Sequence, residues 1–545
     1  MSEKLVSFAA HDGTTISSLA EAGDSALKAL RRVDPSLLDA PCGGAGTCGK
    51  CRVLVVSGDA GTPDAEEIRR LGAPAVAEGV RLACRIIPVG PITLAPAVSS
   101  GGAVIRESFS ALSGKPNPRI KEKGAYGIAV DIGTTTIAAY LIEFVPQDEC
   151  CARVIASASK LNRQRAFGAD VIARIDYSSR EKGGLAELAE LVRGDIRELG
   201  GKLLAKIGAK PEVVREISVV GNTTMLHLFA KVDPSGIAVA PFTPVFLDLR
   251  RSPATDYDLP YPKAELMLAP SVAGYVGADL VAAARAVALE ERDALALILD
   301  LGTNGEMALG DKTGVLACAT AAGPAFEGAA ISCGTGGVVG AVDQLEWKDG
   351  VLGWTTIGDE PPIGICGSGI IDAAACLIRA GIADDTGALD ERWSECGYPL
   401  VEYKGATIKF TQGDIRQIQL AKAAVAGGIS SMLRARGATA DDVDRVYLAG
   451  GFGSYLQPDS AAVIGLIPPE LLPKVETVGN AAGHGAVRML LYKDELARIS
   501  ALASSIEYLE LSGLPYFSER FVEEMFFPAP DAVLPAVKAR EPTAP

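Results

Sequence analysis

At 545 residues the chain is long enough for three or four domains, each with its own hydrophobic core. Hydrophobic residues make up 48% and charged residues 22%, which is ordinary for a globular protein. The formal net charge of −15 argues against nucleic acid as a partner, because neutralising phosphates needs a basic surface. No run of about 18 to 20 apolar residues is present, so no membrane span is expected.

The cysteine content bears on the compartment of the chain. Eleven cysteines are present, an odd number, and the start MSEKLVSFAAHDG lacks the basic and apolar segments of a secretory signal. A disulfide framework is therefore not expected. We expect a chain of the reducing cytoplasm, where clustered cysteines hold a metal centre.

Residues 1–95 predict a small mixed sheet. LVSFAA and TTISSL form a hairpin around the turn at 11–13, because its Asp-Gly pair favours a tight turn. The apolar runs RVLVV at 52–56 and ITLA at 92–95 predict two further strands.

A cysteine-rich loop lies within this first segment. Cys42, Cys48 and Cys51 follow C-x5-C-x2-C spacing, and Cys84 comes after 32 intervening residues. Four thiolates are what a [2Fe–2S] cluster requires, two on each iron. The loop glycines allow the backbone to take positive φ, so that their N–H groups can point at cluster sulfurs. These glycines are Gly43, Gly44, Gly46 and Gly49.

A structural zinc site is the alternative for these four cysteines. Zinc sites usually present paired C-x2-C knuckles, and this segment has only one short pair. With its x5 gap, the segment resembles adrenodoxin-type ferredoxins more than plant-type ones, and either resemblance implies a β-grasp fold. The other cysteines show no ligand spacing and are expected to be buried small apolar residues. They are Cys150, Cys151, Cys318, Cys333, Cys366, Cys376 and Cys396.

Residues 96–123 differ from both flanking segments. Ser, Gly, Pro and Lys dominate and no hydrophobic period persists, which predicts a flexible linker. A coil of this length spans roughly 30 Å on average, so it would let the first domain move between two contacts. The last residues, 529–545, are rich in Pro and Ala and are expected to form a frayed tail.

An internal repeat organises the rest of the chain. GIAVDIGTTTIAAYLI at 127–142 places two apolar runs around a Gly/Thr turn, and LALILDLGTNGEMALG at 295–310 repeats that design. Asp300 follows Asp131 by 169 residues. Two copies predict two similar α/β lobes rather than a solenoid. The predicted lobes are residues 124–294 and 295–528.

Three glycine-rich segments follow the second hairpin. A predicted strand at 443–451 runs into LAGGFG, a loop that lets a purine lie against the backbone. GICGSGIID opens a helix whose N-terminus favours anions or ribose oxygens, and VGNAAGHG opens a helix expected at the lobe interface. A further helix is predicted over 413–436. The nucleotide-binding residues predicted in these segments are Gly367, Ser368, Gly369, Gly450, Gly451 and Gly453.

The two hairpin turns carry the predicted phosphate contacts. Their backbone N–H and hydroxyl groups can bind phosphate oxygens, and a neighbouring carboxylate can hold Mg²⁺. Asp131 and Asp300 are therefore the predicted catalytic residues, which hold magnesium and orient the water that hydrolyses ATP. The predicted phosphate-binding residues are Gly133, Thr134, Thr135, Gly302, Thr303 and Asn304.

Several other polar residues leave two interpretations open. Glu306 either assists at the site or is an exposed strand glutamate, and Glu327 either reaches the site or belongs to a structural turn. His227 is expected to be a core or interface histidine rather than a catalyst. A polar group in LNRQRAFGADV suggests a contact with a partner or between lobes. Its members are Asn162, Gln164 and Asp170.

In this order, the two hairpins and three glycine-rich segments resemble the superfamily of acetate and sugar kinases, heat-shock chaperone ATPases and actin. The resemblance covers about residues 124–515. It implies two ribonuclease-H-like lobes with ATP and Mg²⁺ between them, joined here through a linker to a β-grasp ferredoxin domain.

Over nearly its whole length the chain resembles the reductive activators of corrinoid proteins, including GNTTMLH, AAGPAFEGA, GICGSGIID and LAGGFG. The resemblance implies ATP-dependent electron transfer from a [2Fe–2S] cluster to a Co(II) corrinoid protein, which restores the Co(I) state used by methyltransferases. It also implies an upstream low-potential electron donor and a homodimer. No cysteine follows Cys396, so the C-terminal [4Fe–4S] ligands of the archaeal methylamine-type activators are missing. The electron is therefore expected to pass through the N-terminal cluster alone.

Three other functions remain open from the sequence. One is a small-molecule kinase with an added redox domain, although no acceptor-binding insertion is evident. Another is an activator of a 2-hydroxyacyl-CoA dehydratase. Cys366 stands where those proteins place a cluster ligand, but a second cysteine at matching spacing is lacking. The last is a regulatory module that binds ATP without hydrolysing it.

Overall fold

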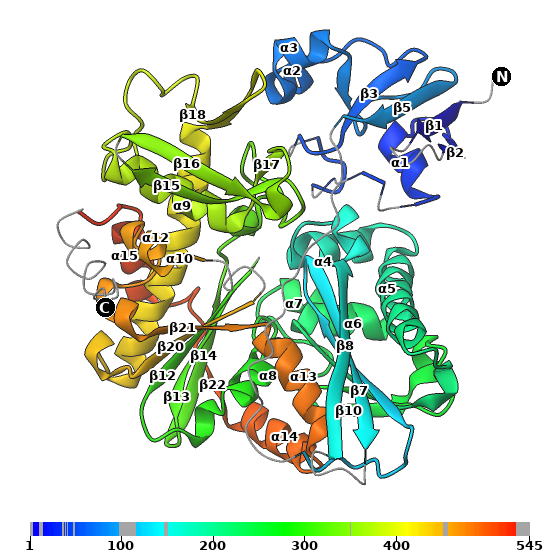
Figure 1. Cartoon of the computed structure of the whole chain (residues 1–545), viewed down its shortest axis with the longest axis vertical. Helices are drawn as coiled ribbons and strands as arrows, with labels where there is room; N and C mark the ends of the chain where they lie inside the picture. The colour runs from blue at the N-terminus through cyan, green and yellow to red at the C-terminus, as the bar shows by residue number, and fades with distance from the viewer. Residues whose placement is uncertain are drawn as a thin grey trace. The chain divides into compact units, whose positions relative to one another are not determined.

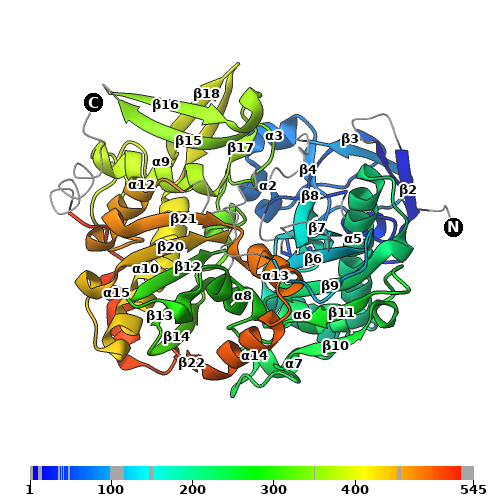
Figure 2. The ribbon, with the colours of Figure 1, turned by 60° about the horizontal axis from the view of Figure 1, so that its bottom comes forward.

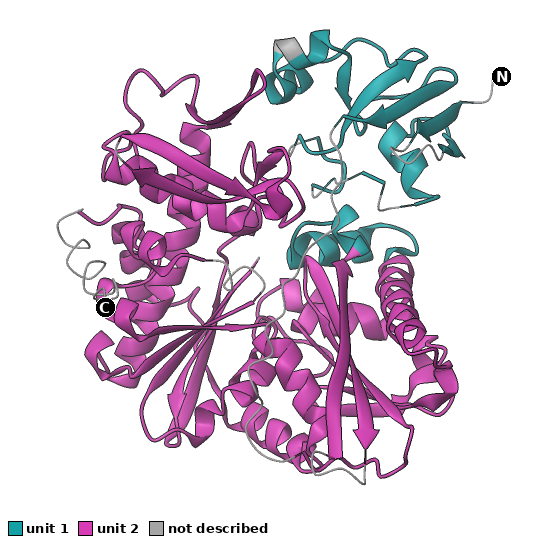
Figure 3. Cartoon of the chain, viewed as in Figure 1, with its two compact units in different colours: residues 1–102, 163–184 teal, residues 103–162, 185–545 magenta. Residues whose placement is uncertain are grey.

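The computed structural model describes residues 4–9, 15–34, 37–38, 40, 42–46, 49–97, 116–145, 151–302, 304–348, 350–450 and 456–529. The chain divides into two compact units (Figure 3). Unit 1 comprises residues 1–102 and 163–184, and unit 2 comprises residues 103–162 and 185–545. Each unit has a hydrophobic core of its own.

Unit 1 is built on a five-stranded sheet in the order β2-β1-β5-β3-β4 (Figure 1). β1 and β5 run parallel, and the other neighbouring strands run antiparallel. This mixed sheet is the expected β-grasp arrangement, and the predicted strands are all present. The predicted turn at 11–13 lies outside the described residues. The strands are β1 (Leu5–Ala9), β2 (Thr15–Leu19), β3 (Arg52–Ser57), β4 (Val80–Leu82) and β5 (Ile92–Pro96).

The helices of unit 1 come from two distant parts of the chain. Helix α1 begins after Ser25, whose side chain accepts a hydrogen bond from the N–H of Lys28 and so caps the helix. Leu27 and Leu30 of α1 bury their side chains in the core with Phe8. The helices are α1 (Ala26–Arg31), α2 (Ala65–Leu71), α3 (Ala73–Ala77), the 3-10 helix η1 (Arg163–Ala166) and α4 (Val171–Arg180).

Unit 2 contains two six-stranded sheets that share one plan (Figure 1). In each, three antiparallel strands follow one another, and a later strand pairs parallel with the first of them. The repeated plan confirms the two ribonuclease-H-like lobes expected from the repeated hairpin. The first sheet has the order β10 (Arg250–Pro253), β11 (Glu265–Leu268), β9 (Val214–Gly221), β6 (Tyr126–Ile132), β7 (Thr136–Val145) and β8 (Cys151–Leu161). The second has the order β21 (Val475–Gly479), β20 (Arg445–Ala449), β12 (Ala296–Leu301), β13 (Gly305–Asp311), β14 (Gly314–Thr320) and β22 (Glu507–Tyr508).

One helix from the C-terminal part of the chain packs on the first sheet. α13 (Ala481–Leu491) lies against β6, β7 and β9 and beside α8 (Ala278–Ala286) (Figure 2). The two helices approach closely, because a Cβ at Gly485 would lie 2.2 Å from the carbonyl oxygen of Ala282. The sequence predicted that the segment opening α13 lies at the interface between the lobes. α13 belongs to the range predicted for the second lobe, 295–528, but it packs on the sheet of the first lobe, which agrees with that prediction.

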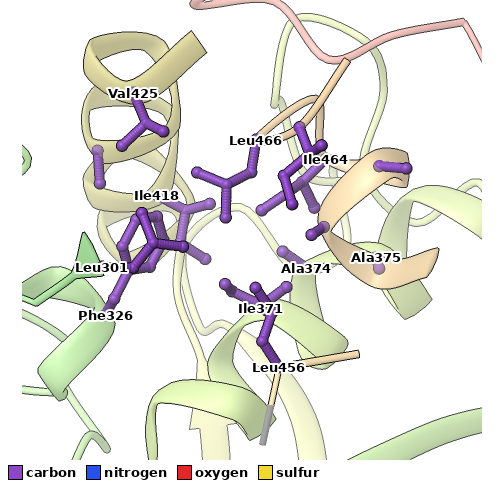
Figure 4. Packing of buried hydrophobic residues seen from close by; sticks show 14 of the residues in the cluster. Leu301, Phe326, Ile371, Ala374, Ala375, Ile418, Val425, Leu456, Ile464 and Leu466 are labelled. Carbon is purple, nitrogen blue, oxygen red and sulfur yellow. The ribbon is translucent and has the colours of Figure 1, made fainter. Parts of the chain in front are cut away.

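The second sheet is covered by α10, which packs on β13 and β14. The predicted helix at 413–436 is confirmed as α10 (Gln412–Arg436). Thr411 and Asp414 form a capping box at its start, which satisfies backbone N–H groups that the helix leaves unpaired. Figure 4 shows the core beside it, where Ile418 and Val425 meet Ile371, Ile464 and Leu466.

Smaller elements complete unit 2. The two additional sheets are β16 (Val351–Thr356) with β15 (Ala341–Lys348) and β17 (Gly364–Ile365), and β18 (Tyr398–Tyr403) with β19 (Ala406–Phe410). The remaining helices are α5 (Gly184–Lys206), α6 (Thr223–Ala230), α7 (Ser235–Ala238), α9 (Gly367–Arg379), α12 (Pro458–Val463), α14 (Glu495–Ser505) and α15 (Pro515–Glu523). None of the helices in the described parts of the chain has the length and apolar character needed to cross a bilayer.

The C-terminal end of the predicted linker is held by hydrogen bonds. Asn117 pairs with the chain at Tyr492, and the guanidinium of Arg119 donates two hydrogen bonds to the carboxylate of Glu216, at 2.8 and 3.1 Å. Arg119 also donates to the carbonyl oxygen of Met489. Any free linker is therefore shorter than 96–123, and residues 98–115 lie outside the described part of the chain, as do residues 530–545.

Candidate functional site

The cysteine loop of unit 1 has the backbone that its glycines predict. Gly43, Gly44, Gly46 and Gly49 have φ values of 66°, 98°, 78° and 67°. A side chain would strain the backbone at these positions, so the loop can wrap closely only with glycine. Cys42 lies in this loop, whereas Cys48 lies outside the described residues.

Three of the four predicted ligand cysteines lie close together. The thiol of Cys51 is buried and shares a hydrogen bond with that of Cys84. This bond raises the pKa of Cys51, and so do burial and the nearby Cys42. Bringing thiolates so close is costly unless a cation binds them, and ferric iron is such a cation.

Three arginines surround the cysteine loop. Arg31 donates to the carbonyl oxygens of Ala40 and Gly43, at 3.1 and 3.2 Å. Arg52 donates to the carbonyl oxygen of Gly49 at 3.0 Å. The guanidinium of Arg85 lies over Gly46, 2.8 Å from where a Cβ would stand.

Arg31 and Arg52 fix carbonyl groups of the loop, and Arg31 also lies close enough to three cysteines to interact with their charge. Their positive charge suits a centre that is negative in both oxidation states. Within the described residues no three Cys, His, Asp or Glu side chains form a complete metal site as they stand, and Cys48 is outside that set. The clustered thiols, the positive-φ glycines and the cations nevertheless fit an iron–sulfur cluster.

The first hairpin of unit 2 turns at Gly133. Asp131 is the last residue but one of β6, and the turn at 133–135 leads into β7, as predicted. A Cβ at Gly133 would lie 2.5 Å from the carbonyl oxygen of Thr136, so the turn is tight. Asn162 holds the turn, because its side-chain amide donates to the Gly133 oxygen at 3.0 Å and its backbone N–H to the Thr135 oxygen at 2.9 Å.

The second hairpin turns at Gly302, whose N–H donates to the carbonyl oxygen of Asn304 at 3.1 Å. Asp300 pairs across the sheet with Ala449, and its Oδ1 lies 2.6 Å from where a Cβ at Gly450 would stand. Gly450 has a φ of 89°. Asp300 and the first glycine of LAGGFG are thus brought together, while Thr303 and residues 451–455 lie outside the described residues.

Four carboxyl groups and one amide gather at this second hairpin. Glu306 stands directly across from Asp300 on β13, and a hydrogen bond joins it to Asp279 from the first turn of α8. Glu327 lies near Gly302, with its Oε1 3.9 Å from where a Cβ would stand there. Its proximity to the site is one of the two interpretations that the sequence left open. Glu306 is only 5% exposed, so the alternative of an exposed strand glutamate is wrong.

Burial and mutual repulsion hold these groups near protonation. Burial raises the pKa of Asp300 to about 7, helped by the charges of Asp279 and Glu327. Burial raises the pKa of Asp279 to about 6, and burial with the neighbouring Asp279 raises the pKa of Glu306 well above its usual range. A bound divalent cation would relieve this repulsion, because carboxylate oxygens are its preferred ligands.

Asn222 connects the two hairpins. It follows β9, whose last residue, Gly221, pairs with Ile132 at the end of β6. From there its side-chain amide donates to Oε1 of Glu306 at 2.8 Å. One side-chain hydrogen bond therefore joins the residue after β9, the neighbour of β6, to β13, the neighbour of β12. It brings the two hairpins to the same region of unit 2.

The first turn of α9 contributes mainly packing. Ser368 donates its hydroxyl to the carbonyl oxygen of Asp343 at 2.8 Å, and a Cβ at Gly369 would lie 2.5 Å from the Val342 oxygen. With Gly367, these residues are buried against β15. Only their backbone groups remain for a nucleotide.

His227 is confirmed as a core histidine. It is fully buried, its Nδ1 bonds the carbonyl oxygen of Thr223 at 2.8 Å, and its Nε2 accepts from the N–H of Val245. Burial lowers its pKa, so the ring stays neutral. It has no proton-transfer role at the site described here.

The remaining cysteines divide by burial. Cys318, Cys366 and Cys376 are buried, as expected of small apolar residues. Cys151 and Cys333 are only half-buried, and Cys150 lies outside the described residues. Cys396 is exposed, so the expectation is wrong for Cys396. Its position in a turn after α9, beyond the core of the second lobe, is the reason.

Sequence reasoning missed Asp279, Asn222 and the three arginines. An acid in the first turn of the largely apolar helix α8 was a usable signal for Asp279. Arg52 and Arg85 each follow a ligand cysteine directly, which was a signal for a charged surround. Nothing near Asn222 in sequence indicates Glu306 as its partner, since 84 positions separate them.

A β-grasp cysteine-loop unit and a body of two ribonuclease-H-like sheets with phosphate turns define an iron–sulfur protein fused to an ATPase. Family models match in the same order. Residues 9–89 match a 2Fe-2S iron-sulfur cluster binding domain, residues 126–292 match the RACo middle region, and residues 294–538 match the C-terminal domain of RACo, the ASKHA domain.

Similar proteins extend over most of the chain. The corrinoid activation enzyme RamQ of Eubacterium limosum is 33% identical over 428 residues, which are 75% of this chain and 71% of that protein. A Methanosarcina barkeri protein, [Co(II) methylated amine-specific corrinoid protein] reductase, is 23% identical over 74% of this chain and 77% of its own length. The solved structure of a reductive activator for corrinoid,iron-sulfur protein covers 96% of this chain and 98% of its own, with 29% identity and a TM-score of 0.70. The chain belongs to the family of corrinoid activation enzymes.

Proposed function

We propose that the chain is an ATP-dependent reductive activator of a corrinoid protein. One electron leaves a reduced [2Fe–2S] cluster and reduces the Co(II) of the partner to Co(I), the state from which methyl transfer proceeds. The observation that carries the proposal is the presence in one chain of a thiol-lined loop and two linked phosphate turns.

The cluster site consists of Cys42, Cys48, Cys51 and Cys84. Four cysteines suit a [2Fe–2S] centre, which supplies a one-electron couple when bound. Arg31 orients loop carbonyls and offsets negative charge, which eases the addition of an electron. An upstream low-potential donor must return that electron, because each transfer leaves the cluster oxidised.

The nucleotide site consists of the two hairpins. Backbone N–H groups at 133–135 and 302–304 would hold the phosphates, and the LAGGFG loop and the first turn of α9 would hold the nucleoside. Asp131 and Asp300 would hold Mg²⁺, with Glu306 and Glu327 beside Asp300. An ionised Asp300 is the form that binds a cation and orients water.

The energetics explain why the two sites share a chain. Plant-type [2Fe–2S] clusters have potentials near −400 mV, and each further 100 mV costs about 2.3 kcal/mol per electron. Nucleotide turnover can offset that cost by changing how the partner is held.

The test is anaerobic and spectroscopic. The reduced protein is mixed with a Co(II) corrinoid protein, with and without MgATP, and the Co(I) absorbance is followed. We expect Co(I) to accumulate only with ATP. Identical spectra in both mixtures would refute the proposal. Cys51→Ser should abolish the reaction together with the visible cluster spectrum, whereas Cys396→Ser, at an exposed position, should change neither.

We also propose that the protein is cytoplasmic and that it forms a homodimer. A location in the reducing cytoplasm suits thiols that must bind iron rather than form disulfides. Sedimentation of the intact chain would test the dimer, for which a mass of twice 56.4 kDa is expected.

A further inference from the structure

Residues 163–184 belong to unit 1, although unit 2 flanks them on both sides in sequence (Figure 3). The chain leaves unit 2 after Asn162 and re-enters it at Leu185. The sheet β2-β1-β5-β3-β4 is complete without this segment. Its place in unit 1 must therefore come from side-chain and backbone contacts rather than from strand pairing.

Phe167 makes the central contact. Its side chain is 6% exposed, and a Cβ at Gly43 of the cysteine loop would lie 3.3 Å from its carbonyl oxygen. The backbone of the cysteine loop therefore rests directly on the backbone at Phe167. The ring of Tyr177 from α4 lies 4.8 Å from the Phe167 ring, measured between centroids.

Arg31 joins this aromatic pair to the ligand cysteines. Its guanidinium lies 5.3 Å from the centroid of the Phe167 ring, in the range of a cation–π contact. The same guanidinium bonds the carbonyl oxygen of Gly43. The Arg31 guanidinium interacts electrostatically with Cys51 and Cys42, and burial lowers the pKa of Arg31. A single cation thus bonds the cysteine loop, lies over the Phe167 ring of the 163–184 segment and interacts electrostatically with the ligand cysteines.

The segment is internally rigid. Arg174 is fully buried and donates to the carbonyl oxygen of Gly168 at 3.0 Å and to Oε1 of Gln164 at 3.3 Å. Asp170 caps α4 by accepting from the N–H of Ala173. Gln164 and Asp170, which the sequence marked as an unusual polar group, therefore hold the turn that presents Phe167.

Asn162 connects the segment to the first phosphate turn. It is fully buried, five positions before Phe167, and bonds both Gly133 and Thr135. A shift of the turn when phosphate binds must move Asn162 or break these bonds. Arg163, the next residue in the chain, is the first residue of η1, so Asn162 is joined directly to the segment by the backbone.

We propose that residues 163–184 are a positioning element for the cluster loop, in which Phe167 and Arg31 clamp the loop at Gly43 and Asn162 makes the clamp responsive to nucleotide. The functional role of this element rests on the proposed function. Its physical effect does not: the segment sets how much water reaches the loop, and thereby sets the reduction potential of the cluster.

The first experiment removes the clamp from the intact, cluster-loaded protein. In Phe167→Ala, water reaches the loop and stabilises the extra charge of the reduced cluster. We expect amide exchange at 42–46 to quicken about tenfold. At a fixed applied potential the ratio of reduced to oxidised cluster should rise by up to tenfold, which corresponds to 59 mV for one electron.

Arg31→Gln should move that ratio in the opposite direction, because a cation that favours the reduced state is lost. Two matched controls lie beside these positions. Ile172→Ala changes an exposed apolar residue of α4, and Lys28→Gln removes an exposed cation from α1. Neither should alter exchange or potential. Phe167→Leu is a milder variant that retains the volume needed for folding.

If Phe167→Ala and Phe167→Leu both match the controls in loop exchange and in potential, the clamp does not exist. The opposite changes expected in the ratio of reduced to oxidised cluster distinguish the clamp from general loosening of the fold, because loosening would shift the Phe167 and Arg31 variants in the same direction.

The second experiment tests the connection to nucleotide. A non-hydrolysable ATP analogue with Mg²⁺ should change amide exchange at 42–46 in the native chain. Asn162→Ala should abolish that change while nucleotide still binds, as measured by calorimetry. An unchanged response in Asn162→Ala, or none in the native chain, would overturn the nucleotide connection.

These outcomes are distinct from those of the proposed function. Corrinoid reduction that does not depend on ATP would refute the proposed function, but it would not affect the results for the Phe167 and Arg31 variants. A loop insensitive to Phe167 would refute the clamp even if ATP drove Co(I) formation.

Discussion

The two hairpins of unit 2 occupy the same position in two similar sheets. In each, an aspartate near the end of the first strand precedes a glycine turn. Across the first hairpin Asp131 faces Ala138, whereas across the second Asp300 faces Glu306. One topology thus supplies an apolar neighbour in one lobe and a second carboxyl in the other.

The difference extends to the surroundings of the two turns. Asn162, which holds the first turn, bonds the backbone oxygens of Gly133 and Thr135. At the second, Asp279 and Glu327 add two further carboxyl groups, and Asn222 bonds a carboxyl oxygen. The repeat therefore provides the scaffold twice, while the additional carboxyl groups described here gather at the second hairpin.

The largest expected effect comes from Asp300→Asn. Loss of the carboxylate should lower kcat for ATP hydrolysis by about 10²–10³-fold, in the range seen when a group that stabilises the transition state is removed. Asp131→Asn should cost about tenfold, because the residue opposite it across the hairpin is Ala138 rather than a second carboxylate. Equal losses of kcat in the two variants would contradict the proposed difference between the two hairpins. In the native protein the rate should rise as pH passes about 7, since ionised Asp300 is the active form.

The second effect concerns stability and pH. Asp300, Asp279 and Glu306 have raised pKa values in the folded chain, so the folded state binds more protons than the unfolded state above pH 4. Stability without nucleotide should therefore fall as pH rises from about 4 to about 7. Glu306→Gln should raise the free energy of unfolding at pH 8, because it removes a carboxyl group whose ionisation burial opposes.

Denaturant melts at pH 5 and pH 8 measure this effect. Added Mg²⁺ should stabilise the native chain more at pH 8, where the carboxyl groups ionise. Asp256→Asn, at a surface position, is the matched control and should leave the pH dependence unchanged. If the free energy of unfolding of the native chain did not change between pH 5 and pH 8, the clustering of these buried carboxyl groups would be contradicted.

The third effect tests the link between the hairpins. Asn222→Ala removes the N-cap of α6, where the Asn222 side chain accepts from Thr224, and the hydrogen bond to Glu306. We expect a loss of about 1–2 kcal/mol in the free energy of unfolding. Asn222→Asp keeps the cap but adds a charge beside Glu306. It should be worse at pH 8 than at pH 5, and the opposite order would argue against the contact.

The smallest effect lies on the third strand of each sheet. Thr320 stands opposite Gly305 and donates its hydroxyl to the Gly305 oxygen at 3.2 Å, whereas Leu161 stands opposite Thr136 in the first sheet. Thr320→Val should cost about 0.5–1.5 kcal/mol in thermal or denaturant unfolding. Thr407→Val, on the exposed strand β19, should cost less.

Local features of the sequence predicted much of the fold. Alternating apolar runs around Gly133 and Gly302 indicated both hairpins, and the glycines of the cysteine loop indicated positive φ. Such signals are strong because strand pairing across a short turn and the steric limits on φ depend on adjacent residues.

The acidic group could not be found in the same way. Asp279, Glu306 and Glu327 come from a helix, a strand and a 3-10 turn, and only the packing of α8 beside the second hairpin unites them. The sequence left Glu306 open between a role at the site and an exposed strand position, because alternation along one strand does not reveal which helix covers that face. Similarly, no local pattern placed Phe167 on the cysteine loop.

The amino-acid sequence by itself determined which groups this protein possesses: four spaced thiols, two aspartate–glycine turns and the repeat that carries them. Tertiary structure alone decided which of those groups meet, since contacts such as Asn222 with Glu306 and Arg31 with Phe167 join residues distant in sequence. The physical reason is that backbone conformation is set by neighbours along the chain, whereas burial, and the pKa shifts that follow from it, are set by neighbours in space.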